Sequence, residues 1–361
     1  MGYFCTKCSK VQRIRTKDIA QKAGVSLGTV DRVIHNREGV SKKSREKVLS
    51  IMKELGYEPN RYASALASNR SFSFACLIPA HSEGEYWEQV EKGLVDGSRE
   101  FADLGINLTF FYYDSFDYPS FGASAGKILE GKFNAVIIGP TVKEFTLPFT
   151  SVLDGRGIPY IFVDANIEGA SPLAYFAQHA IMSGYFTAGI VLPLRERCRE
   201  RVAVFETSRK NLTGSNQQVS REEGFRKWIC ENSSPVSLLK VNLPPERDRN
   251  YDAKILGEFF GKNPDIKTGV IFNSRAYAVG EYLRDNSIRD FDLTGYDLLP
   301  RNVECLKGGW ISRLISQRPH EQGYEAVKAL CGKLILHKET RPENLMPIDL
   351  LTKDNIDFYF Q

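Results

Sequence analysis

Side chains that could bind a polyhydroxylated molecule follow several short apolar runs in this 361-residue chain. These residues are His81, Tyr86, Trp87, Asp114, Asp164, Asn273 and Asp297. Aromatic rings can cover the C–H faces of such a molecule, and Asp and Asn can pair with its hydroxyl groups. The chemistry that these residue types predict is binding. Each Asp or Asn could alternatively cap the helix that follows its apolar run.

The elements that position these residues alternate between strand-like and helical patterns from residue 72 onward. The strand-like runs are Phe74–Pro79, Leu108–Tyr113, Ala135–Gly139, Tyr160–Val163, Val202–Phe205, Leu238–Val241, Gly269–Phe272 and Leu293–Gly295. Helical patterns of crossover length include Trp87–Leu104, Ile181–Leu194 and Tyr251–Phe260. This alternation predicts parallel sheets in two doubly wound lobes. Ligands of such sheets bind at the carboxyl ends of the strands, where the polar residues lie.

The sequence gives little evidence for a phosphate-binding loop or a catalytic nucleophile. No G-x-G-x-x-G or G-x-x-x-x-G-K-[ST] follows any of the apolar runs, so nucleotide-phosphate loops are not expected. The segment from Gly122 through Ser124 to Gly126 has the spacing of a nucleophile elbow, but the preceding strand-like run ends eight residues earlier. We therefore expect a helix of small residues there, no catalytic residue and no cofactor.

The cysteines and the first residues indicate the compartment. Seven cysteines are scattered along the chain, as is typical of reduced cytoplasmic proteins. Cys5 and Cys8 form a lone C-x-x-C without a second pair, so we expect no metal site. No run is long enough to span a membrane, and no secretory signal opens the chain. Residues 1–15 are expected to be a disordered basic extension or an over-long gene start.

Residues 16–34 have the pattern of two short helices joined by a turn at Gly24. Thr16 and Ser26 are residue types that cap helix N-termini. The inward-facing positions are Ile19, Ala20, Ala23, Val30, Val33 and Ile34. The pattern predicts a helix-turn-helix whose second helix can lie in the DNA major groove, with an ordinary helical hairpin as the alternative.

A third helix and a short connecting segment follow. Ser41 begins a helix with an apolar face of Val48, Met52 and Leu55, and Gly56 ends it. We place a head domain at residues 16–59 and a hinge helix at residues 60–70. The hinge has about two turns of good helix formers, a length that is marginal in water without a partner.

Charge separates the first 70 residues from the rest of the chain. Residues 1–70 hold 15 Lys and Arg against 6 Asp and Glu, a net charge of +9, whereas the whole chain carries only +4. The remaining residues are therefore slightly acidic. Such asymmetry is expected of a nucleic-acid-binding head on a separate body.

Ordered short motifs over residues 16–70 carry a family resemblance. They are Asp18-Ile19-Ala20, Ala23-Gly24-Val25-Ser26, Thr29-Val30, Arg32-Val33, Val40-Ser41, Arg45-Glu46-Lys47-Val48, Leu55-Gly56-Tyr57, Pro59-Asn60-Arg61 and Ala65-Leu66-Ala67. This set resembles the headpiece of the LacI/GalR family of bacterial transcription regulators. The resemblance implies a hinge helix that orders on the operator and inserts Leu66 into the minor groove. The DNA-contacting residues expected are Thr16, Ser26, Leu27, Gly28, Thr29, Asp31, Arg32, Asn60, Arg61, Ala63 and Leu66.

The recognition helix departs from the commonest family pattern at two places. Asp31 stands where many members carry Ser, and Leu27-Gly28 stand where base-reading polar residues are frequent. An aspartate could accept from a cytosine amino group or could orient Arg32. The operator sequence therefore does not transfer from relatives.

The resemblance extends more loosely over residues 72–361. It implies a type I periplasmic-binding-protein-like body with three crossovers between an N-lobe, about 72–175 and 319–335, and a C-lobe, about 177–317 and 338–361. Asp164, Arg221, Asn273 and Asp297 match family effector contacts, whereas His179 departs from the usual residue. The effector-binding residues expected are His81, Tyr86, Trp87, Asp114, Asp164, Gln178, His179, Arg221, Asn273, Asp297 and Gln317.

These observations predict a ligand-responsive, sequence-specific DNA-binding transcription regulator. The expected fold is a three-helix head with a hinge helix, followed by a two-lobed α/β body. We expect a homodimer that represses carbohydrate-utilisation genes from a near-palindromic operator, with a sugar as effector. A transport-type sugar-binding protein is disfavoured by the head, and a sugar-active enzyme by the missing phosphate loops.

Overall fold

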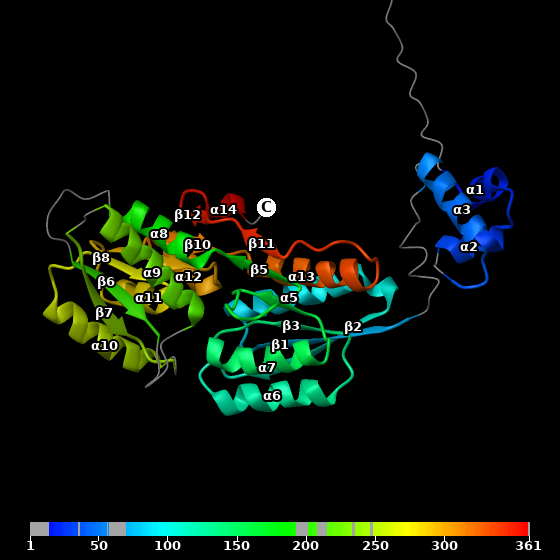
Figure 1. The fold of residues 1–361 in the computed structure, drawn as a ribbon. Helices are drawn as coiled ribbons and strands as arrows, with labels where there is room; N and C mark the ends of the chain where they lie inside the picture. The colour runs from blue at the N-terminus through cyan, green and yellow to red at the C-terminus, as the bar shows by residue number, and fades with distance from the viewer. Residues whose placement is uncertain are drawn as a thin grey trace, which may run out of the picture. The chain divides into compact units, whose positions relative to one another are not determined.

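The computed structural model describes residues 14–34, 37–55, 57, 70–192, 201–207, 215–232, 235–245 and 248–359, which belong to two compact units (Figure 1). The first unit ends at Ala67 and the second begins at Ser68. The predicted hinge helix at 60–70 lies almost wholly outside the described residues, as do Cys5 and Cys8.

The first unit is built from three helices around a small apolar core. They are α1 (Thr16–Ala23), α2 (Leu27–Ile34) and α3 (Lys42–Leu55). The core contains Ile19, Ala20, Ala23, Val30, Val33, Val48 and Ile51. Gly24 adopts a left-handed conformation with φ 64°, which glycine adopts without a Cβ clash, and so turns the chain from α1 toward α2. The predicted helix-turn-helix is therefore confirmed.

Of the two predicted caps, Thr16 and Ser26, the structure confirms Ser26, and Ser41 also caps the helix that it was expected to begin. The Ser26 Oγ accepts from the Thr29 N–H at 3.1 Å, and the Ser41 Oγ accepts from the Ser44 N–H at 3.2 Å. The expectation for Thr16 is wrong, because Thr16 is already the first helical residue and Arg15 occupies the cap position. Asp18 completes this start by accepting from the Arg15 N–H at 2.8 Å.

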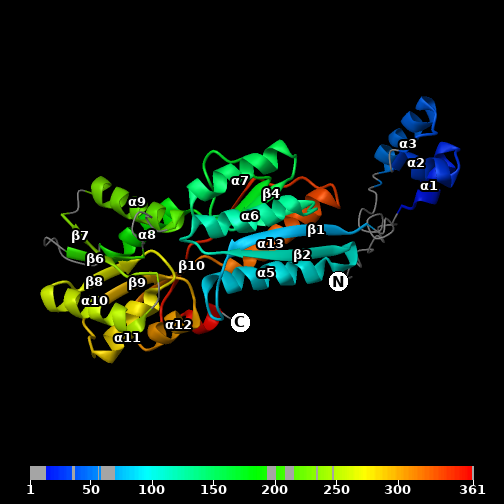
Figure 2. The ribbon, with the colours of Figure 1, turned by 90° about the horizontal axis from the view of Figure 1, so that it is seen from below.

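The second unit contains two lobes, each with a six-stranded sheet between two layers of helices (Figure 2). The N-lobe sheet has the order β11-β5-β4-β3-β1-β2 and is parallel throughout. Its strands are β1 (Phe72–Pro79), β2 (Ile106–Tyr113), β3 (Ala135–Ile138), β4 (Tyr160–Val163), β5 (Ala174–Gln178) and β11 (Glu343–Met346). Its helices are α5 (Tyr86–Glu100), η1 (Ala102–Leu104), α6 (Tyr118–Glu130), α7 (Lys143–Gly155) and α13 (Pro319–Leu334).

The C-lobe repeats this plan with the order β12-β10-β9-β8-β6-β7. Its strands are β6 (Arg201–Glu206), β7 (Ser237–Asn242), β8 (Thr268–Ile271), β9 (Asp292–Tyr296), β10 (Arg313–Ser316) and β12 (Asp349–Leu351). Its helices are α8 (Ala180–Val191), α9 (Asn216–Glu231), α10 (Arg249–Lys262), α11 (Ala276–Asp285), α12 (Pro300–Lys307) and α14 (Ile356–Tyr359). Only β12 runs antiparallel to its neighbour among the described strands.

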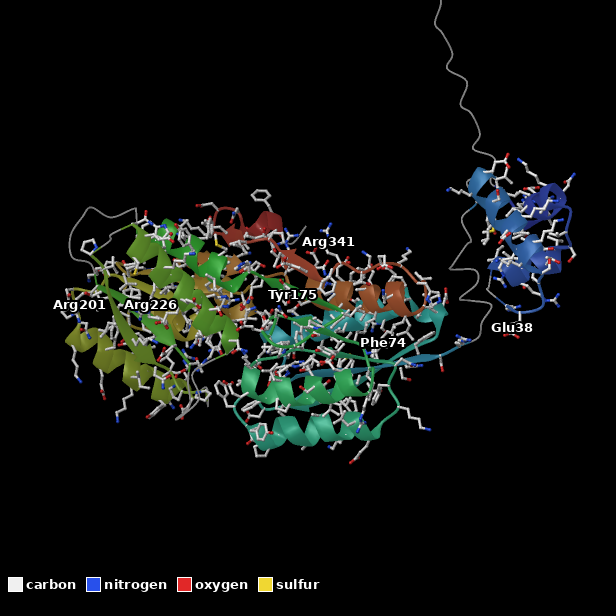
Figure 3. All side chains as sticks on the ribbon, viewed as in Figure 1. Glu38, Phe74, Tyr175, Arg201, Arg226 and Arg341 are labelled. Atoms are coloured by element: carbon white, nitrogen blue, oxygen red, sulfur yellow. The ribbon has the colours of Figure 1, made fainter. Side chains whose placement is uncertain are left out.

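Packing separates the interior of each lobe from its surface. Helices α6 and α7 cover one face of the N-lobe sheet, while α5 and α13 pack together on the other. Phe74 lies fully buried within the N-lobe, whereas Arg201 and Arg226 are on the C-lobe surface (Figure 3). No described helix is long and apolar enough to cross a membrane.

Glycines bring one helix pair in each lobe into close contact. A Cβ at Gly184 of α8 would lie 1.8 Å from the Arg221 carbonyl oxygen of α9, and a Cβ at Gly93 of α5 would lie 2.0 Å from the His320 carbonyl oxygen of α13. No side chain larger than hydrogen fits at these crossings. The backbone that carries Arg221 is therefore fixed by a neighbouring glycine.

The lobe boundary at the C-terminus differs from the expectation. Residues 338–361 were assigned to the C-lobe, but β11 pairs with β5 in the N-lobe sheet, and the chain enters the C-lobe sheet only at β12. Parallel pairing with β5 satisfies the backbone hydrogen-bonding groups on the outer side of β5. The third crossover is therefore the short segment around Pro347 and Ile348.

Candidate functional site

A pocket lies between the carboxyl ends of the two sheets, as the fold predicts for a ligand site. It is lined from the N-lobe by Pro79, Ala80, Glu85, Tyr86, Trp87, Ser115, Phe116, Thr141, Val142 and Asp164. The C-lobe contributes Thr207, Ser215, Gln217, Arg221, Asn273, Ser274, Arg275, Tyr277, Asp297 and Leu299, and Gln317 lies between β10 and α13.

Seven of the predicted effector residues line this pocket. They are Tyr86, Trp87, Asp164, Arg221, Asn273, Asp297 and Gln317. They come from both lobes and from the end of a crossover, so the fold brings together positions up to 231 residues apart. Their assigned contacts with an effector remain predictions.

Tyr86 and Asp164 form the N-lobe side of the polar centre. The Tyr86 hydroxyl donates to Asp164 Oδ1 at 2.7 Å, and the Tyr86 ring packs edge-to-face on Trp87 with centroids 5.3 Å apart. Burial raises the pKa of both Tyr86 and Asp164, while the Tyr86 hydrogen bond and nearby Arg221 oppose the shift for Asp164. Tyr86 therefore stays protonated and acts as a donor.

Arg221, Asp297 and Gln317 form the C-lobe side. The Gln317 Nε2 donates to Asp297 Oδ1 at 2.8 Å, and its Oε1 accepts from Arg221 Nη2. Arg221 also donates to the Phe272 carbonyl at 2.7 Å and stacks over the Tyr296 ring at 4.1 Å. Burial raises the pKa of Asp297 to about 7, although Arg221 and Gln317 oppose the shift.

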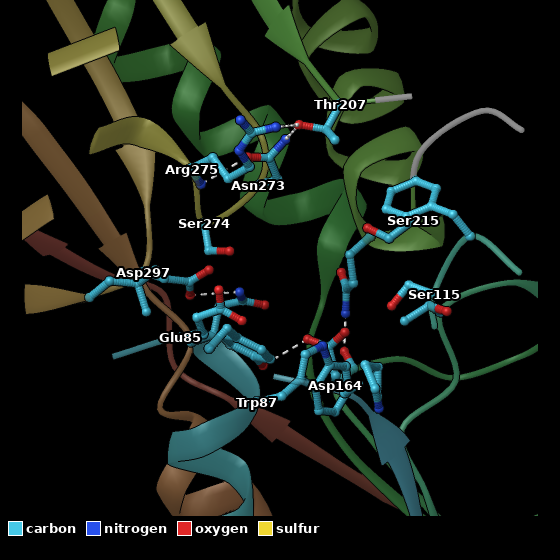
Figure 4. A pocket seen from close by; sticks show the side chains of 18 of the residues that line it. Glu85, Trp87, Ser115, Asp164, Thr207, Ser215, Asn273, Ser274, Arg275 and Asp297 are labelled. Atoms are coloured by element: carbon cyan, nitrogen blue, oxygen red, sulfur yellow. Dashed lines mark hydrogen bonds between the residues drawn. The ribbon is translucent and has the colours of Figure 1, made fainter. Parts of the chain in front are cut away.

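A second polar group in the pocket is centred on Asn273 and Arg275, which both point toward Thr207 (Figure 4). The Asn273 Nδ2 donates to Thr207 Oγ1 at 3.1 Å and to Gln218 Oε1 at 2.7 Å. Arg275 pairs with buried Asp252 at 2.8 Å. Thr207, Asn273 and Arg275 all line the pocket.

Four predicted effector residues lie outside the pocket lining. His81 contacts the Pro79 carbonyl at 3.0 Å and Glu91 at 3.3 Å. Asp114 Oδ1 accepts from the Phe116 N–H at 2.8 Å, so it stabilises a turn. For both residues, geometry supports the structural alternative.

The other two residues lie at the crossover that follows β5. Gln178 is buried and donates to the carbonyls of Ser316 at 2.9 Å and Pro347 at 2.8 Å, which ties the three crossovers together. His179 caps α8, because its Nδ1 accepts from the Met182 N–H at 3.3 Å. Neither side chain reaches the pocket, because one faces the crossovers and the other faces a helix terminus.

Several lining residues were not singled out from the sequence. Gln217 and Arg221 are four residues apart on α9 and so share one helix face, a spacing that could have identified Gln217. Arg275 comes two residues after Asn273 beyond the end of β8, and no sequence pattern separates it from a surface arginine. Gly122 and Gly126 lie within α6, where the Ser124 Oγ donates to the Tyr112 carbonyl at 2.6 Å, so no nucleophile elbow forms.

In the head, the predicted DNA-contacting residues gather at the start and outer face of α2. Ser26, Leu27, Gly28, Asp31 and Arg32 are exposed, with Leu27 55% exposed despite its apolar side chain. Thr16 and Thr29 are half-buried. The predicted contacts Asn60, Arg61, Ala63 and Leu66 lie outside the described residues.

Asp31 forms an ion pair with Arg37. Its Oδ2 accepts from Arg37 Nη1 at 3.1 Å, and the same bond links α2 to the segment before α3. The structure thus pairs Asp31 with Arg37 and leaves Arg32 on the exposed face.

A helix-turn-helix head on a two-lobed α/β body with an interlobe pocket defines a class of ligand-responsive DNA-binding transcription regulators. Residues 16–60 match the family described as bacterial regulatory proteins, lacI family, and residues 74–338 match the periplasmic binding protein domain. The chain belongs to the lacI family.

Individual relatives cover most of the chain. The HTH-type transcriptional regulator RegA of Clostridium saccharobutylicum is 38% identical over 348 residues, which is 94% of this chain and 98% of RegA. CelR of Thermobifida fusca, also an HTH-type transcriptional regulator, is 30% identical over 69% of this chain and 70% of its own. A solved chain from Bacteroides fragilis, described as a candidate LacI transcriptional regulator, is 43% identical with a TM-score of 0.76 and covers 80% of this chain and 100% of its own. These relatives are regulators and not enzymes.

Proposed function

We propose that this regulator represses carbohydrate-utilisation genes in the cytoplasm and responds to a sugar or sugar derivative. The observation that carries the proposal is the pocket itself. Two buried carboxylates, Asp164 and Asp297, lie with Arg221 in one cavity beside the Tyr86–Trp87 pair. Carboxylates accept from adjacent hydroxyl groups, a guanidinium donates to them, and the rings cover apolar faces.

Effector binding is proposed to act on contacts that already join the lobes at this pocket. The Asn216 N–H at the start of α9 donates to the Thr141 carbonyl at 3.0 Å, and Gln217 Nε2 donates to the Asp164 carbonyl. A ligand between the lobes shifts the equilibrium between the lobe arrangement that has these contacts and arrangements that lack them. It does so only if its affinity for these arrangements differs. The proposed output is whether two hinge helices can meet on DNA.

On DNA, we propose a homodimer on a near-palindromic operator, since a two-fold protein matches a two-fold site. Helix α2 would enter the major groove, and residues 60–70, with Leu66 as the wedge, would widen the minor groove. The exposure of Ser26, Leu27, Asp31 and Arg32 on one surface of the head supports this placement.

The test is fluorescence anisotropy of labelled upstream DNA with the full-length protein, titrated with a panel of sugars. We expect specific binding that one panel member alters by at least tenfold. Arg221→Ala should bind the same DNA normally yet fail to respond. Sugar binding without specific DNA binding would instead indicate a transport-type binding protein.

A further inference from the structure

The charge of the interlobe pocket restricts the class of ligand that it accepts. Among the described lining residues, the ionisable acids are Glu85, Asp164 and Asp297, and the bases are Arg221 and Arg275. A phosphorylated sugar or a sugar acid would need cationic groups that are free to meet its charge. Whether the pocket offers them depends on the two arginines.

The charge of Arg275 is already neutralised by Asp252, a carboxylate that does not line the pocket. Its Nη2 lies 2.8 Å from Asp252 Oδ2, and both side chains are less than a tenth exposed. Its Nη1 donates to the Pro244 carbonyl at 2.6 Å. Asp252 lines a separate, smaller cavity on the other side of Arg275 and does not line the interlobe pocket. A guanidinium stays charged when buried, so it requires this partner, and the pair presents no net charge to the ligand.

Arg221 is the remaining cation, and it lies near two buried carboxylates. Its guanidinium stabilises the charged forms of both Asp164 and Asp297, yet burial still holds both pKa values above their ordinary range. With Arg275 paired to Asp252, the described lining holds one remaining cation, Arg221, against three acids, Glu85, Asp164 and Asp297. A further anion would add repulsion in a site where screening by water is weak.

Resting on the sugar-responsive function above, we propose that the ligand is an uncharged polyhydroxylated ring, and that the Asp252–Arg275 pair excludes phosphorylated and carboxylated analogues. Hydroxyl groups can donate to Asp164 and Asp297 without bringing charge. The aromatic surfaces of Trp87 and Tyr277 suit the C–H faces of a ring. A second cation is also disfavoured, because Arg221 already stabilises the charged forms of both acids.

The experiment is isothermal titration calorimetry on the full chain with matched sets of compounds. Each set holds a neutral hexose or pentose, its phosphate ester, its uronic acid and its amino derivative. We expect one neutral member to bind and its phosphate and acid to bind at least 100-fold more weakly. A charged member that binds as tightly as its neutral parent would overturn the inference while leaving the sugar-responsive function intact. Failure of every set would overturn both.

Asp252→Asn tests the mechanism of exclusion. Releasing the Arg275 charge should reduce the preference for the neutral member over its phosphate by at least tenfold. The control is Asp265→Asn, which removes an exposed C-lobe carboxylate paired with Arg201 at 3.1 Å and should leave the preference unchanged. The double variant Asp252→Asn, Arg275→Gln removes both charges, so it should recover the wild-type preference. A double variant that instead favours the phosphate would contradict the proposed role of the pair.

Discussion

Asp164 and Asp297 occupy equivalent positions in the two lobes. Asp164 follows β4 with φ 74°, and Asp297 follows β9 with φ 69°. Each donates its backbone N–H to the next strand of its sheet, to the Phe176 carbonyl at 3.0 Å and the Ile315 carbonyl at 2.8 Å. A left-handed non-glycine residue costs about 1–3 kcal/mol, so the same strained turn in both lobes indicates a functional constraint. The two turns supply the pocket with one carboxylate from each lobe.

Replacing the C-lobe carboxylate should weaken effector binding without changing DNA binding. Asparagine tolerates positive φ and can still accept from Gln317, so Asp297→Asn removes the charge and keeps the turn. We expect a 5- to 150-fold loss of effector affinity, corresponding to about 1–3 kcal/mol for a buried donor or acceptor left unpaired. Calorimetry measures the loss, and anisotropy on operator DNA should be unchanged. Normal effector affinity would place the ligand elsewhere.

Effector affinity should also depend on pH through Asp297. Burial raises its pKa to about 7, and a hydroxyl group of the ligand donates to the ionised form. Affinity should therefore increase by about tenfold between pH 6 and pH 8 and then level off, with proton release on binding. Titrations in buffers of different ionisation enthalpy measure that release. The profile of Asp297→Asn should be flat over this range.

The same shift predicts the opposite trend for stability of the ligand-free protein. The pKa of Asp297 is higher in the folded chain than its ordinary value of 3.8, so its favourable contribution is complete below pH 3.8. That contribution is lost as pH rises through about 7. The melting temperature of wild type minus that of Asp297→Asn should thus fall across this window. A constant difference would mean that Asp297 is not buried in solution.

The sequence predicted most of the sheet because buried parallel strands appear as continuous apolar runs. All eight predicted runs correspond to β1–β4 and β6–β9. Strands β5, β10, β11 and β12 were not predicted, since each mixes polar with apolar residues. These segments form strands because the folded protein places a neighbouring strand beside them.

The missed strand β5 also accounts for two of the four expected effector residues that lie outside the pocket lining, Gln178 and His179. A polar residue at a strand end points to the pocket only when the strand's alternation places it on that side. Gln178 ends β5 with its side chain toward the crossovers, and His179 is already the cap of α8. Asp164 and Asp297 follow strands that were correctly predicted. His81 and Asp114 do so too, but their side chains contact Glu91 and the Phe116 N–H instead. Arg275 could not be found, since its role depends on the distant partner Asp252.

A glycine on α8 should control the position of Arg221. In Gly184→Ala the new Cβ would clash with the Arg221 carbonyl at 1.8 Å, so α8 and α9 must separate. We expect a destabilisation of about 1–3 kcal/mol from overpacking, together with reduced effector affinity. The control is Gly122→Ala, because no atom lies within 4 Å of a Cβ on this glycine of α6. That change should stabilise the helix by about 0.5–1 kcal/mol. Equal effects of the two substitutions would contradict the role of the crossing.

Operator binding should weaken steeply with salt. Residues 1–70, whose net charge is +9, release counterions from the phosphates that they neutralise, each contributing about 0.9 to the slope of log K against log salt. For a dimer we expect about a 10³-fold loss or more between 50 and 200 mM salt. Arg32→Ala should lower the affinity for operator, whereas Lys262→Ala on the exposed surface of α10 should change neither affinity nor slope. A slope near zero would contradict DNA binding through the head.

Gln322 on α13 connects the two sides of the pocket without lining it. It is fully buried; its Oε1 accepts from the Asp164 N–H at 2.7 Å and its Nε2 donates to the Gln317 carbonyl at 2.8 Å. Gln317 in turn contacts both Asp297 and Arg221. Gln322 thus joins the strained turn of the N-lobe to the crossover that positions the C-lobe side.

Removing this link should uncouple the lobes. Gln322→Met fills a similar volume but leaves the Gln317 carbonyl without this donor, so we expect about 5- to 150-fold more effector to be needed for half-maximal release or capture of DNA. Operator affinity in the absence of effector should remain normal. Because a loss of folding would also reduce this affinity, the measurement shows whether the variant is folded. Lys328→Met, an exposed change on the same helix, is the matched control. If Gln322→Met responds to effector as wild type does, the lobes communicate through the other crossovers, where Gln178 contacts Ser316 and Pro347.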